Sequence, residues 1–393
     1  MKKIRLGDIA TLITKGTTPT TIGFSFVDTG VNFVKIESIG ENGEFLPDKF
    51  AHITDACDKK LKRSQLEEND ILFSIVGAIG RTAIVPRSIL PANTNQALAI
   101  IRIPQNVINL RFALYALQSQ AVEEQSKKQK QGVAQLNLSL KNIADIQIPL
   151  VSSEKQDKIV KNLAAVDSVI TLRKEQIRLI DQLVKSRFIE LFGDPVANDR
   201  GWQTQPLDSV CKTIVDCPHS TPSYTDEDTG YMCIRTSIVK KNRILWDEIE
   251  YIPEHEYYQR IQRKRPEKGD IVYTREGAIL GIAAMIDREC NVALGQRSML
   301  LSPNTAVCLP QFLSAAMNFE SFLWEALGGV SGSASPHINV GDIKAFAIIL
   351  PPIELQEQFA AFVEQTDKSK LAVKRSLEKL EALKKSLMQQ FFG

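Results

Sequence analysis

Few side chains in this chain have the spacing that enzyme chemistry requires. Asp48 follows a proline, and Asp58 precedes Lys60 by two positions, which satisfies the loose nuclease pattern Pro-Asp … Asp-x-Lys. Such a pattern would hold a divalent metal between two carboxylates. The pattern is short and common in charged loops, and the second half of the chain has no equivalent, so it carries little information.

The cysteines and histidines offer no better site. Cys211, Cys217 and His219 have the wrong spacing for a standard zinc site, and the chain has no Cys-x-x-Cys pair. The four histidines are scattered without triad spacing. A Gly-x-x-x-x-Gly-Lys-Ser/Thr loop, an Asn/Asp-Pro-Pro-Tyr motif and a Gly-x-Gly-x-x-Gly turn are all absent from the sequence. We therefore expect no catalytic residue, no bound metal and no cofactor in this chain.

Charge is unevenly distributed along the sequence. The formal net charge is +2, but residues 1–150 carry 18 basic and 14 acidic side chains, whereas 196–350 carry 15 and 19. In the second region the cations gather at 235–243 and 260–268, and the acids at 226–228 and 247–256. Such segregation can give one phosphate-facing side. Solvated charge on loops is the alternative.

The same pattern occurs twice, at an offset of 200 residues. Asn-Asp-Ile-Leu at 69–72 returns as Gly-Asp-Ile-Val at 269–272, and Gly-Ala-Ile at 77–79 returns at 277–279. Glu-x-Gln at 154–156 and Phe-Gly at 192–193 return at 354–356 and 392–393. A period this long exceeds the repeat of a solenoid, which is about 20–50 residues. The 393 residues therefore form two copies of a domain and its tail.

Each copy has the pattern of a small α+β domain. An apolar, β-branched run at 70–76, a glycine turn at 77–80 and a second run at 82–85 predict a hairpin, which the second copy repeats at 270–286. The runs 97–101 and 298–301 extend the sheet. Helical spacing of Leu, Phe and Ala predicts one helix over 110–125 and one over 311–327. We expect a mostly antiparallel sheet in each half.

A long amphipathic helix follows each copy. A proline ends the preceding strand, and Ser153 is the predicted N-cap of the first helix. The helix over 164–191 would be about 42 Å long. Its apolar stripe is too long to bury against a small domain, so we expect the two helices to pack as an antiparallel coiled coil. Two separate helices that each close their own domain are the alternative. The predicted packing positions are Val166, Ile170, Ile177, Ile180, Val184 and Leu191 in the first helix and Val363, Val373, Leu377, Leu380, Leu387 and Phe391 in the second.

The predicted organisation is a domain over 1–152, a helix over 153–195, a second domain over 196–352 and a second helix over 353–393, related by a pseudo-twofold repeat. No stretch approaches the roughly 18 apolar residues of a membrane span. Arg5, Asp8 and a threonine-rich run stand where a signal peptide would have its apolar core. We expect a cytoplasmic protein with reduced cysteines.

This layout resembles the specificity subunit of type I restriction–modification enzymes. The likeness rests on the Glu-x-Gln helix starts after proline and on the Phe-Gly helix ends. The segments 216–222 (Asp-Cys-Pro-His-Ser-Thr-Pro) and 230–237 resemble the opening of one class of target-recognition domain, and 16–19 and 30–36 match the same outline less closely. The resemblance covers essentially the whole chain.

The resemblance implies a non-catalytic DNA reader. Each recognition domain would bind one half of a bipartite, asymmetric site in double-stranded DNA, and the helices would set the gap. A spacer of roughly 40 Å is close to one turn of B-DNA, about 34–36 Å. Two modification subunits would transfer a methyl group from S-adenosylmethionine to a flipped adenine. ATP- and Mg-dependent cleavage would belong to two restriction subunits in systems that have them.

Candidate DNA contacts occupy the predicted turns and loops. Arg and Gln suit bidentate readout of guanine and adenine edges. The loop at 328–333 is glycine-rich and would bring backbone N–H groups near phosphates, with a plain flexible loop as the alternative. The candidates are Lys35, Arg81, Asn95, Gln96, Lys127, Lys128 and Lys130 in the first half and His219, Arg235, Lys240, Lys241, Arg275, Gln296, Arg297 and Ser333 in the second.

Two other functions fit parts of the pattern. One is a tandem-domain scaffold whose sheets bind proteins. The other is a self-contained restriction enzyme or methyltransferase, which the missing motifs argue against. A scaffold would show no sequence preference in a library of DNA duplexes.

Overall fold

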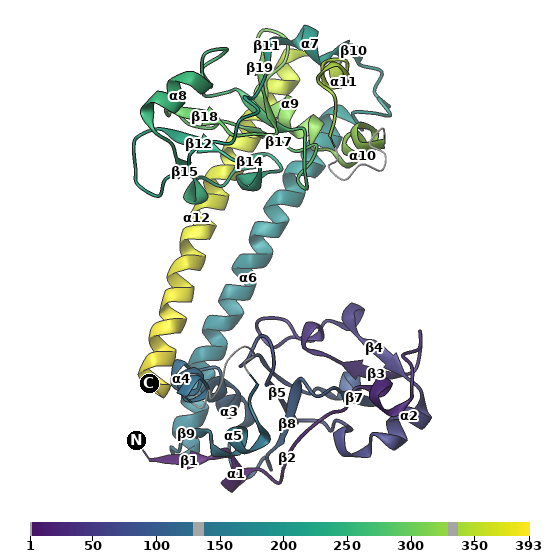
Figure 1. Cartoon of the computed structure of the whole chain (residues 1–393), viewed down its shortest axis with the longest axis vertical. Coiled ribbons are helices and arrows are strands. Elements are labelled where there is room, and N and C mark those ends of the chain that lie inside the picture. Colours follow the sequence, from purple (N-terminus) through teal and green to yellow (C-terminus); the bar gives the residue numbers. More distant parts are fainter. Residues whose placement is uncertain (1, 129–136, 329–336) are drawn as a thin grey trace. The chain divides into compact units, whose positions relative to one another are not determined.

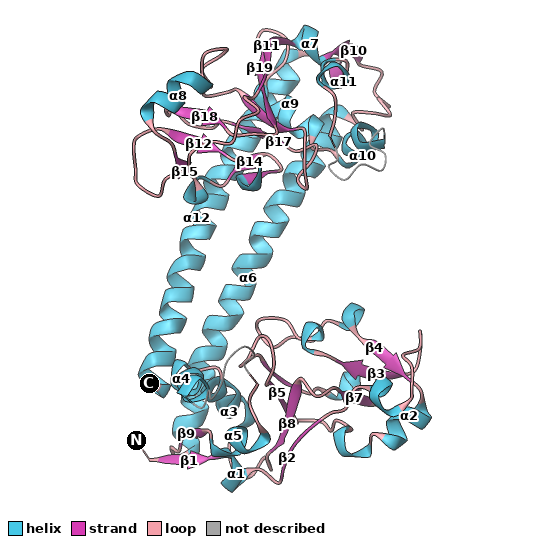
Figure 2. Cartoon of the chain, viewed as in Figure 1, coloured by secondary structure: helices cyan, strands magenta, loops and turns pink. Residues whose placement is uncertain are grey.

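The computed structural model describes residues 2–128, 137–328 and 337–393 and divides into two compact units. Unit 1 comprises Met1–Lys174 and Arg375–Gly393, and unit 2 comprises Glu175–Lys374. Each unit combines sheets with helices (Figures 1 and 2). The α+β class predicted from the sequence is therefore confirmed for both copies.

The main sheet of unit 1 has the strand order β2-β8-β5-β6 and is antiparallel throughout. Strands β5 and β6 form the predicted hairpin, with Ile71 opposite Ile84. The four strands span Leu12–Lys15 (β2), Leu98–Arg102 (β8), Ile71–Ser74 (β5) and Thr82–Ile84 (β6). The β-branched and aromatic side chains of the central strands β5 and β8 are buried on both faces of the sheet, because alternate residues pack in two different hydrophobic clusters.

A second, smaller sheet of unit 1 has the order β4-β3-β7, in which β3 and β7 run parallel. No pattern in the sequence predicts this parallel pair. The strands span Ala51–Ile53 (β4), Val31–Val34 (β3) and Ala92–Thr94 (β7), and the short helix α2 (Asp55–Lys60) follows β4. Thr54 caps α2 by accepting a hydrogen bond from the Cys57 N–H group.

The helix predicted over 110–125 is two helices, α3 (Leu110–Leu117) and α4 (Gln120–Lys128). The break lies at Ser119, whose hydroxyl and carbonyl accept from the Val122 and Glu123 N–H groups and so start a new helix. The serine is not required for the break, because the matching residue of the second copy is Phe319, whose carbonyl accepts from the Leu323 N–H group. The second copy has the same break between α9 (Pro310–Met317) and α10 (Glu320–Gly328).

Unit 2 repeats both sheets. The antiparallel sheet is β11-β19-β16-β17, and the smaller sheet is β15-β12-β18 with β12 and β18 parallel. Unit 2 also has a short hairpin, β13 and β14, where unit 1 has the isolated antiparallel bridge between Ile39 and Phe45. The strands span Cys211–Asp216 (β11), Ser298–Pro303 (β19), Ile271–Thr274 (β16), Ala283–Met285 (β17), Glu250–Tyr251 (β15), Met232–Ile234 (β12), Val292–Leu294 (β18), Val239–Lys240 (β13) and Arg243–Ile244 (β14).

Short elements close each unit around these sheets. In unit 1 they are β1 (Lys3–Arg5), which pairs with β9 (Gln147–Pro149), and the helices α1 (Leu6–Ile9) and α5 (Leu140–Asp145). In unit 2 they are β10 (Gln203–Pro206), which pairs with β20 (Ala347–Leu350), and the helices α7 (Leu207–Val210), α8 (Glu254–Arg260) and α11 (Val340–Lys344). The 3-10 turns are η1 (Pro19–Ile22), η2 (Ile36–Ser38), η3 (Pro47–Lys49), η4 (Lys62–Ser64), η5 (Arg87–Ile89), η6 (Thr236–Ile238) and η7 (Trp246–Glu248).

The two long helices are α6 (Ser153–Phe192) and α12 (Ile353–Phe392). The prediction that Ser153 caps α6 is wrong by one position, because Ser153 already lies in the helix and the Gln156 N–H group donates to the Ser152 carbonyl. Every predicted packing position on both helices is buried or partly buried.

Each long helix contributes to the cores of both units. The beginning of α6 packs in unit 1 through Leu163, and its end packs in unit 2 through Phe192. The beginning of α12 packs in unit 2 through Phe359, and its end packs in unit 1 through Phe392. The alternative in which each helix closes its own domain is therefore wrong.

The repeated glutamine of the helix starts has a structural role. The Gln156 side chain is buried, accepts from the Asn109 N–H group at 2.9 Å and donates to the Val151 carbonyl at 2.9 Å. Gln356 makes the matching contacts with the Leu309 N–H group and the Pro351 carbonyl. A buried amide that satisfies backbone groups on two segments fixes each helix start to its domain.

Within the described ranges, no helix has the length and apolar content that crossing a bilayer requires.

Candidate nucleic-acid interface

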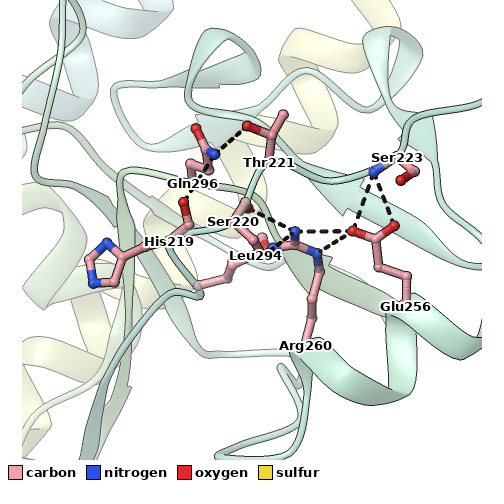
Figure 3. Close-up of polar contacts among 8 residues, drawn as sticks. All are labelled: His219, Ser220, Thr221, Ser223, Glu256, Arg260, Leu294 and Gln296. Atoms are coloured by element: carbon pink, nitrogen blue, oxygen red, sulfur yellow. Dashed lines mark hydrogen bonds and ion pairs between the residues drawn. The ribbon is translucent and has the colours of Figure 1, made fainter.

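The best-defined polar site in unit 2 is the loop 217–224, which connects β11 to the segment before β12 and includes the predicted residue His219. Three groups from distant parts of the sequence converge on it (Figure 3). They are Gln296, just after β18, and Arg260 and Glu256 on α8. We call these three side chains the loop clamp.

Arg260 is the centre of the loop clamp. Its side chain is only 3% exposed. The Nη2 group donates to the Ser220 carbonyl at 2.8 Å and to its hydroxyl at 3.2 Å, and Nη1 donates to the Leu294 carbonyl at 3.4 Å. The fixed fork of the guanidinium thereby ties the loop to the end of β18.

Glu256 lies one helical turn before Arg260, and its Oε1 atom lies 3.1 Å from Nε of that arginine. Both carboxylate oxygens also accept from the Ser223 N–H group, at 3.2 and 3.0 Å. Burial acts to raise the pKa of Glu256, but the hydrogen bonds from Ser223 and Arg260 outweigh it and hold the pKa below its ordinary value. The carboxylate is thus charged and holds the far end of the loop.

Gln296 completes the loop clamp from the other side. Its amide nitrogen donates to the His219 carbonyl at 3.1 Å and to the Thr221 hydroxyl at 2.6 Å (Figure 3). The amide that we selected as an adenine reader therefore has its donor group engaged with the loop. In this structure Gln296 positions the loop.

The loop presents the ring of His219, whose side chain is 70% exposed. Its Nε2 atom lies 3.3 Å from Asp216 at the end of β11. Asp216 is itself held by Arg275, which donates from Nε and Nη2 at 2.9 and 3.1 Å. Arg275 is buried, and its Nε and Nη2 groups are both bonded to Asp216. Its side chain therefore supports the start of the loop.

The other predicted residues of unit 2 lie around this loop or near the β13–β14 hairpin. Arg235 is exposed, pairs with Glu250 and lies 5.0 Å from the ring centre of Tyr224. Arg297 is exposed with a left-handed backbone, φ 67°, a strained conformation for a residue with a side chain. Lys240 donates to a backbone carbonyl on the hairpin, and Lys241 beside it is exposed.

Unit 1 has a simpler version of the loop. Gln96, at the position matching Gln296, accepts from the hydroxyl of Thr18 in the loop after β2. Asn95 accepts from the backbone two residues later. The position matching Arg260 holds Lys60, whose side chain is exposed. In unit 1 the loop is therefore held by Gln96 and by the backbone bond from the Gly16 N–H group to the Asn95 carbonyl.

The remaining predicted residues of unit 1 are spread over separate places. Arg81 donates to the carbonyls of Ile36 and Ile39, which brings it next to Lys35. Lys127 and Lys128 are exposed at the end of α4, where Lys127 pairs with Glu123. Lys130, Ser333 and residues 329–333 of the glycine-rich loop lie outside the described residues.

The sequence reading missed Arg260 and Glu256. Their i, i+4 spacing on a short helix was the available signal, and it is too common to indicate a role. Their partners are remote, because Ser220 lies 40 residues from Arg260. The pattern of acids and cations at 247–268 was noticed only as charge segregation.

The candidate metal sites have other uses in this structure. The Asp58 carboxylate accepts from the amides of Asn93 and Gln65, at 2.9 and 2.5 Å. Cys211 and Cys217 pack in different hydrophobic clusters, and burial raises the pKa of both thiols. Among the residues described, no three His, Cys, Asp or Glu side chains gather as metal ligands would.

Comparison with known proteins gives one consistent family. A family model described as the type I restriction modification DNA specificity domain matches residues 1–182 and again 199–384. The specificity subunit of the type I restriction enzyme EcoBI from Escherichia coli is 32% identical over 172 residues, which are 42% of this chain and 35% of that relative. The specificity subunit of the MjaIX enzyme from Methanocaldococcus jannaschii is 22% identical over 338 residues, which are 80% of this chain and 74% of that relative.

Solved structures have the same fold at low sequence identity. The S subunit of a type I restriction-modification system from M. genitalium is 14% identical, with a TM-score of 0.55 and coverage of 100% of this chain and 96% of that one. A chain from a study of complex assembly and conformational transition in the type I R-M system is 18% identical, with a TM-score of 0.58 and coverage of 99% and 97%. Identities this low establish the fold alone.

Proposed function

The chain belongs to the type I restriction modification DNA specificity family, and from this we propose that it reads a bipartite DNA site for a methyltransferase and restriction complex. The observation that carries the proposal is the double match of the family model, one match to each copy of the repeat. Two tandem readers on one chain suit a site with two different halves. Each copy would read its own half-site.

The geometry of unit 2 supports base reading by a fixed loop. The loop clamp immobilises the backbone of the loop 217–224 and leaves the ring of His219 exposed. Binding by a preorganised loop avoids the entropy cost of ordering it on DNA. The imidazole of His219 can donate to or accept from a base edge or a phosphate. Arg235 and Arg297 supply guanidinium groups for guanine edges nearby.

The same proposal assigns catalysis to other subunits. Two modification subunits would supply S-adenosylmethionine and methylate adenine, and two restriction subunits, where the system has them, would use ATP and Mg. The complex would act in the cytoplasm, where the genome is. A tandem-domain scaffold and a self-contained restriction enzyme or methyltransferase are the competing functions.

We also propose that α6 and α12 pack as an antiparallel coiled coil that sets the gap between half-sites. Ion pairs within each unit support this direction. In unit 1, Asp167 pairs with Lys384 at 2.7 Å and Lys174 pairs with Glu381 at 3.5 Å. The residue number rises along α6 while that of its partner on α12 falls, as in an antiparallel pair. In unit 2, Asp181 pairs with Lys370.

Inserting one heptad into each helix tests this spacer. The insertion keeps the apolar stripes in register and adds about 10.5 Å. Because B-DNA rises roughly 3.4 Å per base pair, the preferred gap should grow by about three base pairs. A four-residue insertion after Thr171 in α6 alone is the control, and it should mainly reduce stability. A paired insertion that stays folded and active with an unchanged gap would exclude a spacer role.

The main experiment compares the chain alone with the chain assembled with its modification subunits. Alone it should neither methylate nor cleave DNA, and the complex should methylate adenine at a split sequence, which genome-wide mapping of methylated bases would identify. Replacing residues 1–150 by the first domain of another family member should change one half of that sequence. Methyl transfer by the isolated chain, or a change in both halves, contradicts the proposal.

A further inference from the structure

Four cationic side chains are crowded onto one short segment of unit 1. Lys59 and Lys60 end α2, and Lys62 and Arg63 begin η4. All four are exposed. No hydrogen bond, ion pair or ring contact holds any of them within residues 2–128, 137–328 and 337–393. We call these four residues the α2–η4 patch.

The acids nearest in sequence form no ion pair with the α2–η4 patch in the described residues. The Asp58 carboxylate accepts from two side-chain amides, and Glu67 pairs with Arg102 at 2.6 Å. Asp55 lies at the opposite end of α2, where acidic side chains favour the helix dipole. Glu68 is exposed, and none of these four carboxylates forms an ion pair with the α2–η4 patch in the part of the chain that the structure describes, so the four cations remain in contact with solvent.

The α2–η4 patch stands on a rigid base. Leu61, in its middle, is buried, and the fully buried amide of Asn93 donates to the Leu61 carbonyl at 3.2 Å. The Ser64 hydroxyl donates to the same Asn93 side chain at 2.7 Å. Asn93 lies in β7, two and three residues before the predicted DNA contacts Asn95 and Gln96. The anchor of the α2–η4 patch is therefore close in the chain to the candidate base-reading loop of unit 1.

Unit 2 shows that the fold does not need these charges. The inward positions match at an offset of 200, since Cys57 and Tyr257 are both buried and Leu61 and Ile261 both pack inward. The four positions that match the α2–η4 patch instead hold Gln259, Arg260, Gln262 and Arg263. The arginine at 260 is buried in the loop clamp, and the one at 263 donates to a backbone carbonyl. The same segment is an internal clamp in unit 2 and a free basic surface in unit 1.

We propose that the α2–η4 patch binds the phosphodiester backbone of DNA beside the half-site that unit 1 reads. This inference rests on the proposed function and deepens it. Lysine is a strongly hydrated point charge that suits phosphate contacts without base preference. Four neutralised phosphates would contribute about 3.6 to the slope of log K against log salt concentration. Between 50 and 200 mM salt, that slope corresponds to about a 150-fold loss of affinity.

The test compares the wild type with K59Q/K60Q/K62Q/R63Q in the full chain assembled with its modification subunits. Binding is measured from 50 to 200 mM salt on a duplex that carries the methylated site and on an unrelated duplex of equal length. The variant should bind both duplexes more weakly at low salt, and its salt slope should be shallower by up to about 3.6. The ratio of the two affinities and the methylated sequence should not change.

Two matched variants complete the design. K59R/K60R/K62R keeps the charge and should keep the salt slope. K141Q/K155Q/K158Q/K161Q removes four other exposed lysines of unit 1 and should leave the slope unchanged. Thermal unfolding and gel filtration establish that each variant is folded and assembled.

The possible results separate the two proposals. An unchanged slope in the Gln variant, with site-specific binding intact, overturns the patch proposal and leaves the proposed function standing. Loss of assembly with unchanged DNA binding also overturns it, because the α2–η4 patch would then dock an acidic protein surface. If the wild-type complex itself shows no sequence preference, the proposed function fails first.

Discussion

The two units bury an aspartate at matching positions but neutralise it from different elements. Asp70, fully buried, accepts from Nε and Nη2 of Arg102 on β8 at 2.7 and 2.8 Å. Asp270 pairs instead with Lys264, which follows α8, at 3.2 Å. Both carboxylates accept the same backbone bond, from Glu67 or Glu267. Both units therefore keep the turn before the hairpin. The cation that pairs with the buried aspartate comes from a different element in each unit.

That difference separates a repeated frame from a variable surface. The frame consists of the hairpin, the buried aspartate, the helix-start glutamines and the terminal phenylalanines, each present in both units. The segment after β4 or β15 varies. In unit 1 it carries the α2–η4 patch, and in unit 2 it carries two of the three side chains of the loop clamp, Glu256 and Arg260. The surface of a recognition domain can therefore change at this segment while the frame of the domain stays the same.

The largest effect should follow removal of a terminal phenylalanine. Phe392 lies 5.3 Å from Phe112 in the core of unit 1, and Phe192 lies 4.8 Å from Phe312 in unit 2. F392A and F192A should each lower the free energy of unfolding by about 3–5 kcal/mol, because each leaves a cavity. Urea unfolding of the full chain measures both losses. L383A, at a half-exposed position of α12, is the control and should cost far less. A small loss in only one of the two variants would mean that the frame is not repeated.

Removing the cation that pairs with each buried aspartate should have the next largest effect on the free energy of unfolding. R102A leaves Asp70 buried without its cation and should cost about 3 kcal/mol of unfolding free energy. K264A should cost less, because Lys264 makes a single ion pair with Asp270, whose side chain is 8% exposed, whereas Arg102 donates twice to the fully buried Asp70. Ser302 matches Arg102 in register, and its buried hydroxyl has no partner in the described structure.

Adding S302R to K264A moves the cation of unit 2 onto its strand, as in unit 1. The double variant should regain the stability lost in K264A, and urea unfolding of the three proteins decides this. A double variant that is less stable than K264A would show that the strand position of unit 2 cannot hold an arginine. The two units would then differ in packing as well as in cation source.

The loop clamp should affect specificity more than stability. R260Q frees the Ser220 backbone, so unit 2 should discriminate less well at its own half-site. A wrong base pair ordinarily costs about 1–3 kcal/mol, so we expect roughly a tenfold lower affinity ratio between matched and mismatched duplexes. Mapping of methylated sites should show degeneracy in one half only. K60Q, at the matching position of unit 1, is the control and should weaken binding without relaxing either half-site.

The sequence predicts the frame well and the loop clamp poorly, for a physical reason. The hairpin and its repeat follow from local signals, namely β-branched runs around a glycine turn. The break at Ser119 is not predicted because apolar spacing continues across it, and the matching break in unit 2 lies at a phenylalanine, so no residue type indicates it. Gln296 was selected for its chemistry, yet its donors are engaged with His219 and Thr221. Contacts between side chains and backbone 40 to 77 residues apart leave no periodic trace.

The smallest effect concerns acid stability and also distinguishes the units. Hydrogen bonds hold the pKa of Glu256 below its unfolded value of about 4.3, against the opposing effect of burial. A lowered pKa stabilises the fold at pH values above the unfolded pKa, and this contribution disappears as the pH falls through the folded pKa. Unfolding free energies measured from pH 5 to pH 3 should therefore fall less steeply in E256Q than in the wild type. Unit 1 has Ala56 at the matching position, so A56Q should not alter the slope. Equal slopes in E256Q and the wild type would mean that Glu256 holds the loop without its charge.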